Sequence, residues 1–419
     1  MTRSPVQLPS LAGADWLADP LLQRLLAALT ADGGEARVAG GAVRNAVLGE
    51  TVSDIDVATT EVPDRVMELA RRAGLEVHPT GLAHGTVTVV AKEAAEARAF
   101  EVTTLRIDVE TFGRHAEVAF TDDWAADAGR RDFTMNALYC DASGTLFDPV
   151  GGFPDLVGRR VRFVGDPEAR IAEDFLRILR FFRFHARYGE GAPDSDGLSA
   201  CIALQEGIGR LSAERIRQET LKLLVAPGAV SALKVMAETG IAARILPTGQ
   251  DVGRLSRMAD IDAKQGYEPD PVLRLAAIGL RSAADAGLLR AALRLSNAEH
   301  DRLEHLAHSV LPSPALGDNE RRIVLYRMKP EGFRDAVRLA WAGQRGDVPA
   351  EDWAGLLALP ERWPVPRFPL SGADLARRGV ASGPEMGQLL KRLEDWWMAA
   401  GFPDKDAVLQ QLAALAADR

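Results

Sequence analysis

A pair of glycines followed by an acid–apolar–acid strand constrains this chain more than any other feature of its sequence. Residues 37–39 form a short β-type run that enters Gly40 and Gly41, and residues 42–48 have a helical composition. Glycine has no side chain and adopts unusual dihedrals, so the backbone can approach a ligand closely here. N–H groups at the start of the helix favour a phosphate. Arg44, one turn into the helix, is placed to contact the same anion.

The strand at residues 54–57 supplies the chemistry. Its side chains alternate, so Asp54 and Asp56 share one face while Ile55 and Val57 share the other. Two neighbouring carboxylates repel each other unless a cation lies between them, and Mg²⁺ is bound by a few carboxylates together with substrate phosphates. Either feature alone is usually a solvated turn or strand edge. Both together, in this order, predict nucleotidyl transfer by two metal ions roughly 3.5–4 Å apart.

A third metal-site acid is expected on another strand. Residues 85–91 and 99–105 alternate and are rich in β-formers, which predicts neighbouring strands. The second contains Glu101, an acid among apolar and hydroxylic residues. If this strand lies beside residues 54–57, Glu101 completes a set of three metal-binding carboxylates. The alternative is a glutamate exposed on a strand.

Several other elements follow from periodicity. Leucines at helical spacing predict one amphipathic helix over residues 11–31. Pro63 predicts the start of a helix that runs through Arg72. Residues 106–121 are polar and lack a clear period before residue 115, so we expect a mobile loop with one short strand, which is a candidate lid beside an active site.

Residues 129–138 form a helix-like run with three polar side chains of interest. Asp132 and Asn136 lie four residues apart, so they and Arg131 are expected to meet on one surface. Arg131 suits a phosphate, whereas Asp132 and Asn136 suit sugar hydroxyls. A solvated Arg–Asp surface pair is the alternative.

Residues 171–188 predict a long helix with one charged row. Asp174, Arg177, Arg180 and Arg183 repeat every three residues, and Phe, Leu and Ile fill the other faces. A carboxylate beside a guanidinium on a rigid helix offers an acceptor next to a fork of donors, which matches the edge of a base. The alternative is a solvated helix bridge worth about 0.2–0.5 kcal/mol.

Composition bounds the class of protein. The chain has 419 residues and a net charge of −9, yet residues 159–187 hold eight arginines against four acids. A basic surface is therefore expected in that segment. The two cysteines, Cys140 and Cys201, form neither a disulfide framework nor a zinc site. The first 19 residues lack a long apolar run, and no apolar stretch reaches the ~18 residues of a membrane helix, so we expect a cytoplasmic protein.

Five motifs together resemble the class II CCA-adding tRNA nucleotidyltransferases, which share their fold with bacterial poly(A) polymerases. The motifs fall in order between about residues 35 and 225. They are Gly-Gly-Ala-Val-Arg at 40–44, Asp-Ile-Asp at 54–56, Arg-Arg-Asp at 130–132, Glu-Asp-Phe-Leu-Arg at 173–177 and Leu-Ser-Ala-Glu-Arg at 211–215.

The resemblance implies a role for each site residue. The metal carboxylates are Asp54, Asp56 and Glu101, and the triphosphate contacts are Gly41 and Arg44. The ribose-discriminating pair is Arg131 and Asp132. The amino-acid template for CTP and then ATP is Asp174 and Arg177, supported by Arg180 and Arg183. One position departs from the family, which usually has Asp where this chain has Asn45. A salt bridge from that position therefore cannot orient Arg44.

The resemblance also implies the architecture and the reaction. The expected fold class is α+β: a nucleotidyltransferase head of the polymerase-β type with a small mixed sheet at residues 1–155, a helical neck at 156–228, and a helical body and tail at 229–419. The head would bind Mg²⁺ with CTP or ATP, the neck would select the base, and the body and tail would hold tRNA. The expected reaction is template-independent addition of C, C and A to the 3′ end of tRNA.

Two alternatives remain open. A poly(A) polymerase, or an enzyme that adds only CC or only A, is the nearest. The long basic extensions expected of a poly(A) polymerase are absent, and residues 82–87 look more like the CCA-adding branch. A non-catalytic RNA-binding module is the other alternative, and its expected mark is the loss of a metal carboxylate.

Overall fold

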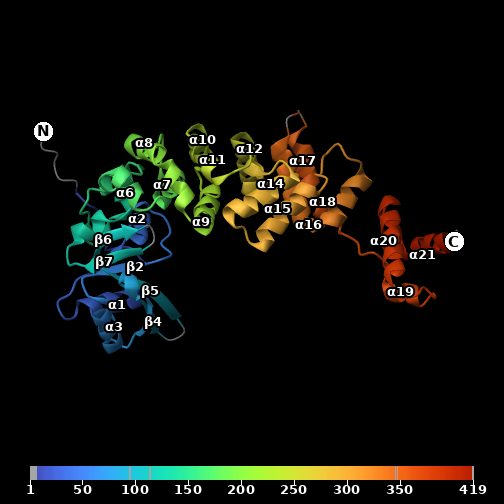
Figure 1. Ribbon diagram of the computed structural model, residues 1–419. Coiled ribbons are helices and arrows are strands. Elements are labelled where there is room, and N and C mark those ends of the chain that lie inside the picture. The colour runs from blue at the N-terminus through green and yellow to red at the C-terminus, as the bar shows by residue number, and fades with distance from the viewer. Residues whose placement is uncertain (1–6, 94–95, 113–114, 345, 347, 418–419) are drawn as a thin grey trace. The chain divides into compact units, whose positions relative to one another are not determined.

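A seven-stranded mixed sheet forms the centre of the N-terminal part of the chain (Figure 1). The computed structural model describes residues 7–93, 96–112, 115–344, 346 and 348–417. The sheet order is β3-β4-β5-β2-β1-β8-β9. The strands are β1 (Ala36–Ala39), β2 (Asp56–Thr59), β3 (Glu76–Gly81), β4 (Thr86–Glu93), β5 (Glu96–Thr104), β8 (Tyr139–Cys140) and β9 (Leu146–Phe147). β2 and β5 pair in parallel and the other neighbours pair antiparallel, so the small mixed sheet of the expected α+β fold is confirmed.

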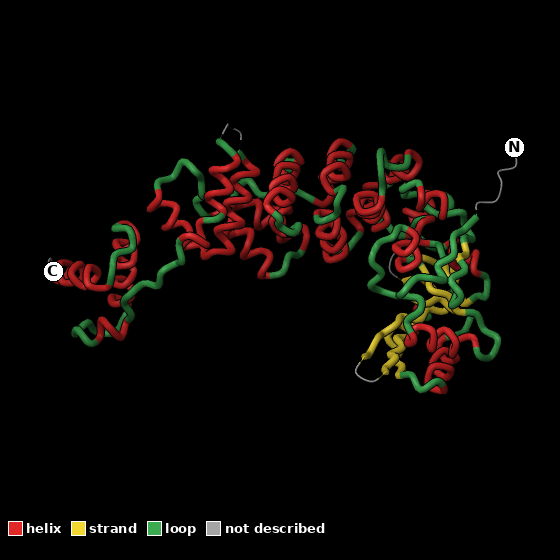
Figure 2. Tube along the Cα trace, turned by 180° about the vertical axis from the view of Figure 1, so that it is seen from behind, coloured by secondary structure: helices red, strands yellow, loops and turns green. Residues whose placement is uncertain are grey.

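Two helices pack together against this sheet. They are α1 (Pro20–Thr30) and α3 (Pro63–Arg72), and Figures 1 and 2 show both beside β4. The prediction for α3 is confirmed. The prediction that the first helix begins at residue 11 is wrong: Asp19 accepts a hydrogen bond from the Leu21 amide (2.8 Å), and proline at position 20 suits a first helical turn but not a helix interior.

The segment predicted as a loop is a β-hairpin. β6 (Arg106–Phe112) pairs antiparallel with β7 (His115–Phe120) as a separate two-stranded sheet. The hairpin is tied to the main sheet at its base, because Leu105 donates to the Thr59 carbonyl and Thr121 donates to the Leu105 carbonyl. Gly113, within the segment predicted as a loop, lies outside the described residues.

The helix-like run predicted at residues 129–138 is mostly not helical. α4 (Trp124–Gly129) ends before it, and a 3₁₀ turn, η2 (Thr134–Asn136), leads directly into β8. The backbone of Phe133 is extended, with φ −122° and ψ 145°. The remaining short elements of this part are α2 (Gly41–Val47), η1 (Leu82–His84) and α5 (Phe153–Val157).

The predicted long helix at residues 171–188 is two helices. α6 (Pro167–Glu173) ends at Asp174, whose backbone is extended (φ −152°, ψ 105°), and α7 (Leu176–Tyr188) starts two residues later. The Asp174 carboxylate accepts a hydrogen bond from the Leu176 amide (3.1 Å), a local bond of the kind that competes with helix continuation. Asp174 therefore does not lie on the helix that carries Arg177, Arg180 and Arg183.

Aromatic packing joins α7 to the sheet region. Phe133 and Phe163 lie with ring centroids 5.0 Å apart, and Phe181 of α7 stacks on Phe163 at 5.5 Å. All three rings are fully buried. The helices that follow α7 are α8 (Ser195–Ala203), η3 (Gln205–Arg210), α9 (Ala213–Leu224), α10 (Ala229–Glu238) and α11 (Ile241–Ile245).

The chain divides into two compact units, Met1–Ile245 and Leu246–Arg419. Every named element of the second unit is a helix, as expected for a helical body and tail. They are α12 (Val252–Gln265), α13 (Pro271–Gly279), α14 (Ala283–Leu293), α15 (Asn297–His308), α16 (Asp318–Gly343), α17 (Ala350–Leu357), α18 (Leu359–Arg362), α19 (Gly372–Ala376), α20 (Pro384–Ala399) and α21 (Lys405–Ala417). None of the helices in the described ranges has the length and apolar character needed to cross a membrane.

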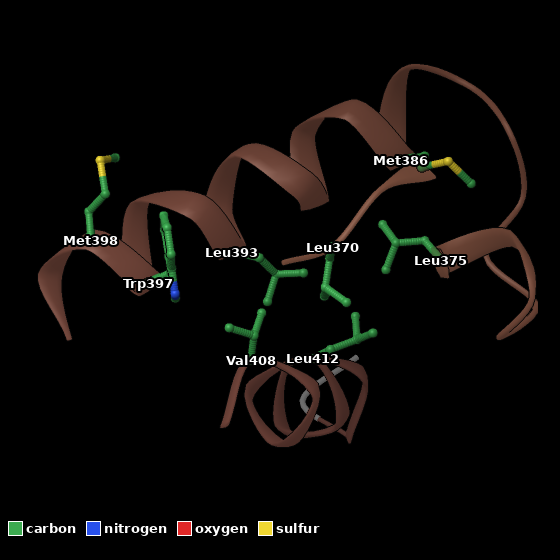
Figure 3. Close-up of a cluster of buried hydrophobic side chains, with 8 residues drawn as sticks. All are labelled: Leu370, Leu375, Met386, Leu393, Trp397, Met398, Val408 and Leu412. Atoms are coloured by element: carbon green, nitrogen blue, oxygen red, sulfur yellow. The ribbon is translucent and has the colours of Figure 1, made fainter. Parts of the chain in front are cut away.

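The last helices of the second unit share a hydrophobic core. Leu393 and Trp397 of α20 are buried with Val408 and Leu412 of α21. Figure 3 shows that the side chains of Leu393, Val408 and Leu412 point toward one another between the two helices. Trp396 and Trp397 both belong to this core, which agrees with packing roles for them.

Candidate active site

The glycine turn opens α2 in a conformation that requires glycine. Gly40 has φ 65° and ψ −113°, and its N–H donates to the Leu138 carbonyl (3.0 Å). A Cβ atom at this position would lie 3.2 Å from Nη1 of Arg131. Gly41 has no positive φ, and the nearest atom to a Cβ there would be 3.7 Å away. Gly40 is therefore fixed by conformation and close packing, whereas Gly41 leaves space above the start of the helix.

Arg44 is buried and held by neutral groups. Its side chain donates to Asn136 Oδ1 (2.5 Å) and to the Tyr188 hydroxyl (2.7 Å), and its Nε and Nη2 donate to Asn45 Oδ1 (3.2 and 3.0 Å). The guanidinium carbon also lies 4.1 Å from the Tyr188 ring centroid. Burial lowers the pKa of Arg44. The absence of the family's aspartate is thus met by Asn45, whose amide oxygen orients Arg44 without a salt bridge.

Asp56 and Glu101 face each other across two parallel strands. Asp56 is the first residue of β2, and its register partner on β5 is Glu101. This pairing meets the condition under which the sequence analysis assigned Glu101 to the metal site. Exposure alternates along the motif: Asp54 and Asp56 are exposed, and Ile55 and Val57 are buried. The strand begins only at Asp56, so Asp54 lies in the segment that leads into it.

These acids line one cleft of about 420 Å³. We call it the carboxylate cleft; its lining residues are Ser53, Asp54, Ile55, Asp56, Thr88, Arg98, Ala99, Phe100 and Glu101. Partial burial raises the pKa of Asp56, and the charges of Glu101 and Asp54 raise it further, whereas Arg131 acts in the opposite sense. The charges of Asp54 and Glu101 thus act on Asp56 within this cleft.

The donor set fits a hard cation. Oxygen ligands of like charge in one cleft repel one another, and a divalent cation removes that repulsion. Within the described residues, no three His, Cys, Asp or Glu side chains form a preassembled metal cage. Mg²⁺ does not need one, because it keeps several waters and takes further ligands from substrate phosphates.

Asp127 anchors Arg131 beside this cleft. The buried Asp127 carboxylate accepts from Arg131 Nη2 (3.1 Å), from Arg130 Nε (2.9 Å) and from the Tyr139 hydroxyl (2.8 Å). Burial alone would raise the pKa of Asp127, but the charges of Arg131 and Arg130 have the larger effect, so its pKa is lowered. Arg131 also donates to the Asn136 carbonyl (3.3 Å). Its position next to Gly40 and Asp56 is therefore fixed from several sides.

Asp132 and Asn136 meet as predicted, within a larger network. Asn136 Nδ2 donates to Asp132 Oδ1 (3.0 Å), while Arg180 Nε donates to Asp132 Oδ2 (2.8 Å). Burial raises the pKa of Asp132, and the charge of Arg180 and the hydrogen bonds lower it by more. Arg44 reaches the same Asn136, so Arg44, Asn136, Asp132 and Arg180 form one connected chain.

Asp174 and Arg177 have separate partners. Asp174 Oδ2 accepts from Arg215 (2.6 Å), whereas Arg177 Nη1 donates to Glu173 (2.6 Å) and to the Arg170 carbonyl (2.6 Å). Asp174 and Arg177 do not form the adjacent pair on one helix that the spacing predicted, because the chain breaks at Asp174.

The other two arginines of the row share an acid on α9. Arg183 pairs with Glu219, and Arg180 Nη1 lies 3.9 Å from the same carboxylate. Both guanidinium carbons also lie over Phe184, at 4.5 and 5.2 Å from the ring centroid. Arg180 and Arg183 are thus held in place between α7 and α9.

The sequence analysis missed several residues that hold the arginines of the site in place. Asp127 was detectable, because it lies three and four residues before Arg130 and Arg131, the spacing of ion pairs on a helix. Tyr188 and Glu219 were not detectable, because Tyr188 lies 144 residues from Arg44 and Glu219 lies 36 residues from Arg183. No local pattern joins residues so far apart.

Comparisons with known proteins cover nearly the whole chain. A family model described as the poly A polymerase head domain matches residues 36–162, and one described as a probable RNA and SrmB-binding site of polymerase A matches residues 193–251. The mitochondrial CCA tRNA nucleotidyltransferase 1 of Mus musculus is 35% identical over 390 residues, which is 90% of this chain and 86% of that protein. A CCA-adding enzyme of Geobacillus thermodenitrificans is 41% identical over 215 residues, 51% of each chain.

A solved structure shows the same fold over the full length. It is the Bacillus stearothermophilus CCA-adding enzyme in complex with CTP, with a TM-score of 0.73 and 26% identity. The match covers 95% of this chain and 98% of that one.

Proposed function

This chain belongs to the family of class II CCA-adding tRNA nucleotidyltransferases and bacterial poly(A) polymerases, and we propose that it adds C, C and A to the 3′ end of tRNA from CTP and ATP. Members of the family are nucleotidyltransferases and typically depend on a metal ion. The observation that carries the proposal is the carboxylate cleft, in which Asp56 and Glu101 face each other next to the Gly40 turn.

In this proposal Asp54, Asp56 and Glu101 hold Mg²⁺. The bound ion would supply charge neutralisation at the transferring phosphate and lower the pKa of the attacking hydroxyl. The terminal 3′-hydroxyl of tRNA attacks the α-phosphate of the nucleotide, the bond to the β-phosphate oxygen breaks, and pyrophosphate leaves. The Asp–Glu pair accounts for the site of reaction because these two carboxylates face each other on paired strands and line one cleft.

The nucleotide is held by groups around this cleft. The backbone at Gly40 and Gly41 and the guanidinium groups of Arg44 and Arg131 bind the triphosphate. Asp132 and Asn136 bind the ribose. Since Asp132 already accepts from Arg180 and Asn136, ribose binding exchanges one of these partners.

The base is selected by Asp174 and Arg177 in the same way. Each has a partner that a base can replace: Arg215 for Asp174 and Glu173 for Arg177. A wrong base would leave one of these partly buried groups without its hydrogen bond, which penalises binding. Arg180 and Arg183 support the template from α7.

The division of labour along the chain is part of the proposal. The head at residues 1–155 binds nucleotide, the neck at 156–228 selects the base, and the body and tail at 229–419 hold tRNA. Limited proteolysis tests the boundaries: a first cut near residue 228 supports the division, and a first cut near residue 246 would assign α10 and α11 to the neck. A cytoplasmic location is also proposed; since the mouse relative is named as mitochondrial, cell fractionation is the test.

The deciding experiment is incubation with tRNA that lacks its 3′ end and with each nucleotide separately. Incorporation of C, C and then A, followed by a stop, is the expected result. Long A tails would instead establish a poly(A) polymerase, an alternative that the matched head-domain description keeps open. Addition of only CC or only A would establish a partial-adding enzyme. No incorporation by folded protein would leave a non-catalytic RNA-binding module.

A further inference from the structure

The second unit contains a pocket of about 630 Å³ at the start of α12. Three arginines line it: Arg254 and Arg257 on α12 and Arg281 just after α13. The rest of the wall comes from the residues between α15 and α16, the end of α16, and α17. We call this the arginine pocket. Its volume is in the range of small-molecule and nucleotide sites.

The charge in the arginine pocket is unbalanced. Asp251 is the one carboxylate among its described lining residues, and Asp251 Oδ1 is already used as an acceptor for the Arg254 amide (2.9 Å) at the start of α12. None of the three arginines forms an ion pair with any described carboxylate of the chain. Three guanidinium groups close together repel one another, and a bound anion would relieve that repulsion.

Backbone contacts hold these arginines in the pocket. Arg254 donates to the Leu280 carbonyl (2.7 Å) and to the Leu339 carbonyl (3.2 Å), and Arg257 donates to the Ala342 carbonyl (2.6 Å). Nε of Arg254 is buried without a hydrogen-bond partner. Burial lowers the pKa of Arg254, and the charges of Arg257 and Arg281 lower it further. These backbone contacts therefore hold the arginines close together despite their mutual repulsion.

Arg281 lies directly over Gly249. A Cβ atom at position 249 would come within 2.4 Å of the Arg281 guanidinium carbon, so a glycine is required for this side chain to lie where it does. Arg281 and Arg257 are both exposed and keep free donors toward solvent. The pocket thus combines the accessible donors of Arg257 and Arg281 with the half-buried Arg254.

Part of the remaining wall is apolar. Leu311, Pro312 and Trp353 belong to the lining residues of the pocket. Inorganic phosphate has no apolar surface to pack against these residues, whereas a sugar or base attached to a phosphate does. The combination of guanidinium donors and an apolar surface matches a nucleotide within a chain.

We propose that the arginine pocket binds a backbone phosphodiester group of the tRNA substrate. The inference rests on the proposed function and names a specific RNA contact in the second unit. The protein carries a net charge of −9, so a polyanion is attracted only where cations are locally concentrated. The pocket is such a place.

The test is the salt dependence of tRNA binding. In the double variant Arg257→Gln/Arg281→Gln, the dissociation constant for tRNA lacking its 3′ end should rise roughly tenfold or more. The slope of log Kd against log salt concentration should fall by about 0.7–0.9 for each phosphate contact that is lost. Arg254 is left intact because its carbonyl contacts also hold the fold.

Two controls separate a site from a general charge effect. Arg257→Lys/Arg281→Lys keeps the charge and should keep most of the slope. Lys234→Gln removes one exposed cation from α10 in the other unit and should change the slope by less than half as much as the double glutamine variant. An unchanged slope in the double glutamine variant, or an equal change in Lys234→Gln, would overturn the proposal.

Chemical protection distinguishes RNA from a small anion. Modification of Arg257 and Arg281 by an arginine-specific reagent is followed by mass spectrometry with tRNA, CTP or inorganic phosphate. Protection by tRNA alone at equal phosphate concentration supports the proposal; equal protection by inorganic phosphate or CTP refutes it. If wild-type protein neither binds tRNA nor incorporates nucleotides, the proposed function fails, whereas normal incorporation with an unaltered slope in the variant refutes only the pocket.

Discussion

At the scale of single residues, the carboxylates proposed to bind the metal ion lower the stability of the fold. Asp56 keeps its charge beside Glu101 and Asp54, and its pKa is raised above the ordinary value of 3.8. An acid with a raised pKa in the folded state stabilises the fold only when protonated, and this contribution is lost as the pH rises through the folded pKa. At neutral pH the ionised Asp56 therefore disfavours folding.

The first prediction follows for Asp56→Asn. Nucleotide incorporation should fall by roughly 10³-fold or more, because metal-assisted charge stabilisation is worth several kcal/mol. The free energy of unfolding at neutral pH should increase, since the repulsive charge is gone, and the difference should vanish in acid as wild-type Asp56 takes up its proton. Urea denaturation across pH measures this.

Magnesium supplies the matched readout for the same variant. Adding Mg²⁺ at neutral pH should stabilise the wild-type protein and have a smaller effect on Asp56→Asn. Asp122→Asn removes an exposed acid of the same unit outside the cleft and should respond to Mg²⁺ as the wild type does. A lower stability of Asp56→Asn than of wild type at neutral pH would contradict the repulsion between the three acids. Asp54→Ala should also be inactive and folded.

The two glycines of the turn give the second prediction. Gly40→Ala should cost of order 1–3 kcal/mol, because the position has φ 65° and the new Cβ would crowd Arg131. Gly41→Ala should cost far less, since its φ is ordinary and the nearest atom is 3.7 Å away. Thermal unfolding of both variants is the measurement, with CTP titration beside it.

Affinity separates the roles of these glycines further. Gly41→Ala should fold normally and yet bind CTP more weakly, because the added methyl group occupies the space where a phosphate approaches the backbone. If Gly41→Ala binds CTP like the wild type, the turn does not contact phosphate at that position. Equal destabilisation by both substitutions would disprove the conformational requirement at Gly40.

At the scale of elements, the junction between α6 and α7 determines how the residues proposed to select the base are positioned. Asp174 accepts a hydrogen bond from the Leu176 amide at the start of α7 and pairs with Arg215 of α9. Its carboxylate therefore lies at a break between two helices and not on a helix face. Another side chain could accept the bond from the Leu176 amide, whereas the proposed recognition of a base requires the Asp174 carboxylate.

The third prediction concerns Asp174→Ala. Selection between CTP and ATP should relax, while the affinity for tRNA stays close to that of the wild type. Stability should fall by about 1 kcal/mol from the lost cap. Single-nucleotide incorporation with CTP, ATP, UTP and GTP measures the selection, and urea denaturation measures the stability.

Asp166→Ala is the matched control for that variant. Asp166 caps α6 through the Ala169 amide (2.7 Å), so its loss removes a similar cap without touching the proposed template. The control should lose stability and keep its base selection. Unchanged selection in Asp174→Ala would remove the template role from this residue.

The elements also show where prediction from sequence stopped. Period-2 alternation predicted the strands that contain Asp56 and Glu101, but it did not predict that β2 and β5 pair, because alternation specifies a strand and its faces and not its neighbour. The break at Asp174 was not predicted, since the three-residue spacing of charges continues through it and the competing bond to the Leu176 amide is local. The hairpin β6–β7 was missed although residues 106–110 alternate between charged and apolar side chains, which is a strand pattern.

At the scale of the whole molecule, the two compact units carry different parts of the proposed task. The carboxylate cleft lies entirely in Met1–Ile245, and the arginine pocket lies entirely in Leu246–Arg419. Changes to the core of one unit should therefore affect one binding partner more than the other.

Leu393→Ala provides the fourth prediction. The buried Leu393 side chain contributes to the core between α20 and α21, so its truncation should destabilise the second unit by about 2–5 kcal/mol. The affinity for tRNA should fall, while the affinity for CTP should not change. Calorimetry and separate CTP and tRNA titrations measure these effects.

Lys391→Ala is the neighbouring surface control for Leu393→Ala. Lys391 is exposed on the same helix, and its substitution should leave the unfolding transition within about 0.5 kcal/mol of the wild type. A loss of CTP affinity in Leu393→Ala would show that the two units do not work independently.

At the level of the whole molecule, the expected architecture came from the family resemblance. It implied a helical body and tail at residues 229–419, and every named element there is a helix. The arginine pocket was not predicted, because Arg254, Arg257 and Arg281 lie on different elements and are brought together only by packing. Long-range contacts of this kind leave no local pattern.

The neutral surroundings of Arg44 have one more consequence. Asn45, Asn136 and Tyr188 accept its hydrogen bonds without carrying charge, while Asp132 and Glu50 act on it only electrostatically. An aspartate at position 45 would have neutralised this guanidinium in the resting protein. With asparagine there, a positive potential persists until an anionic substrate arrives, so nucleotide capture should weaken steeply as ionic strength increases.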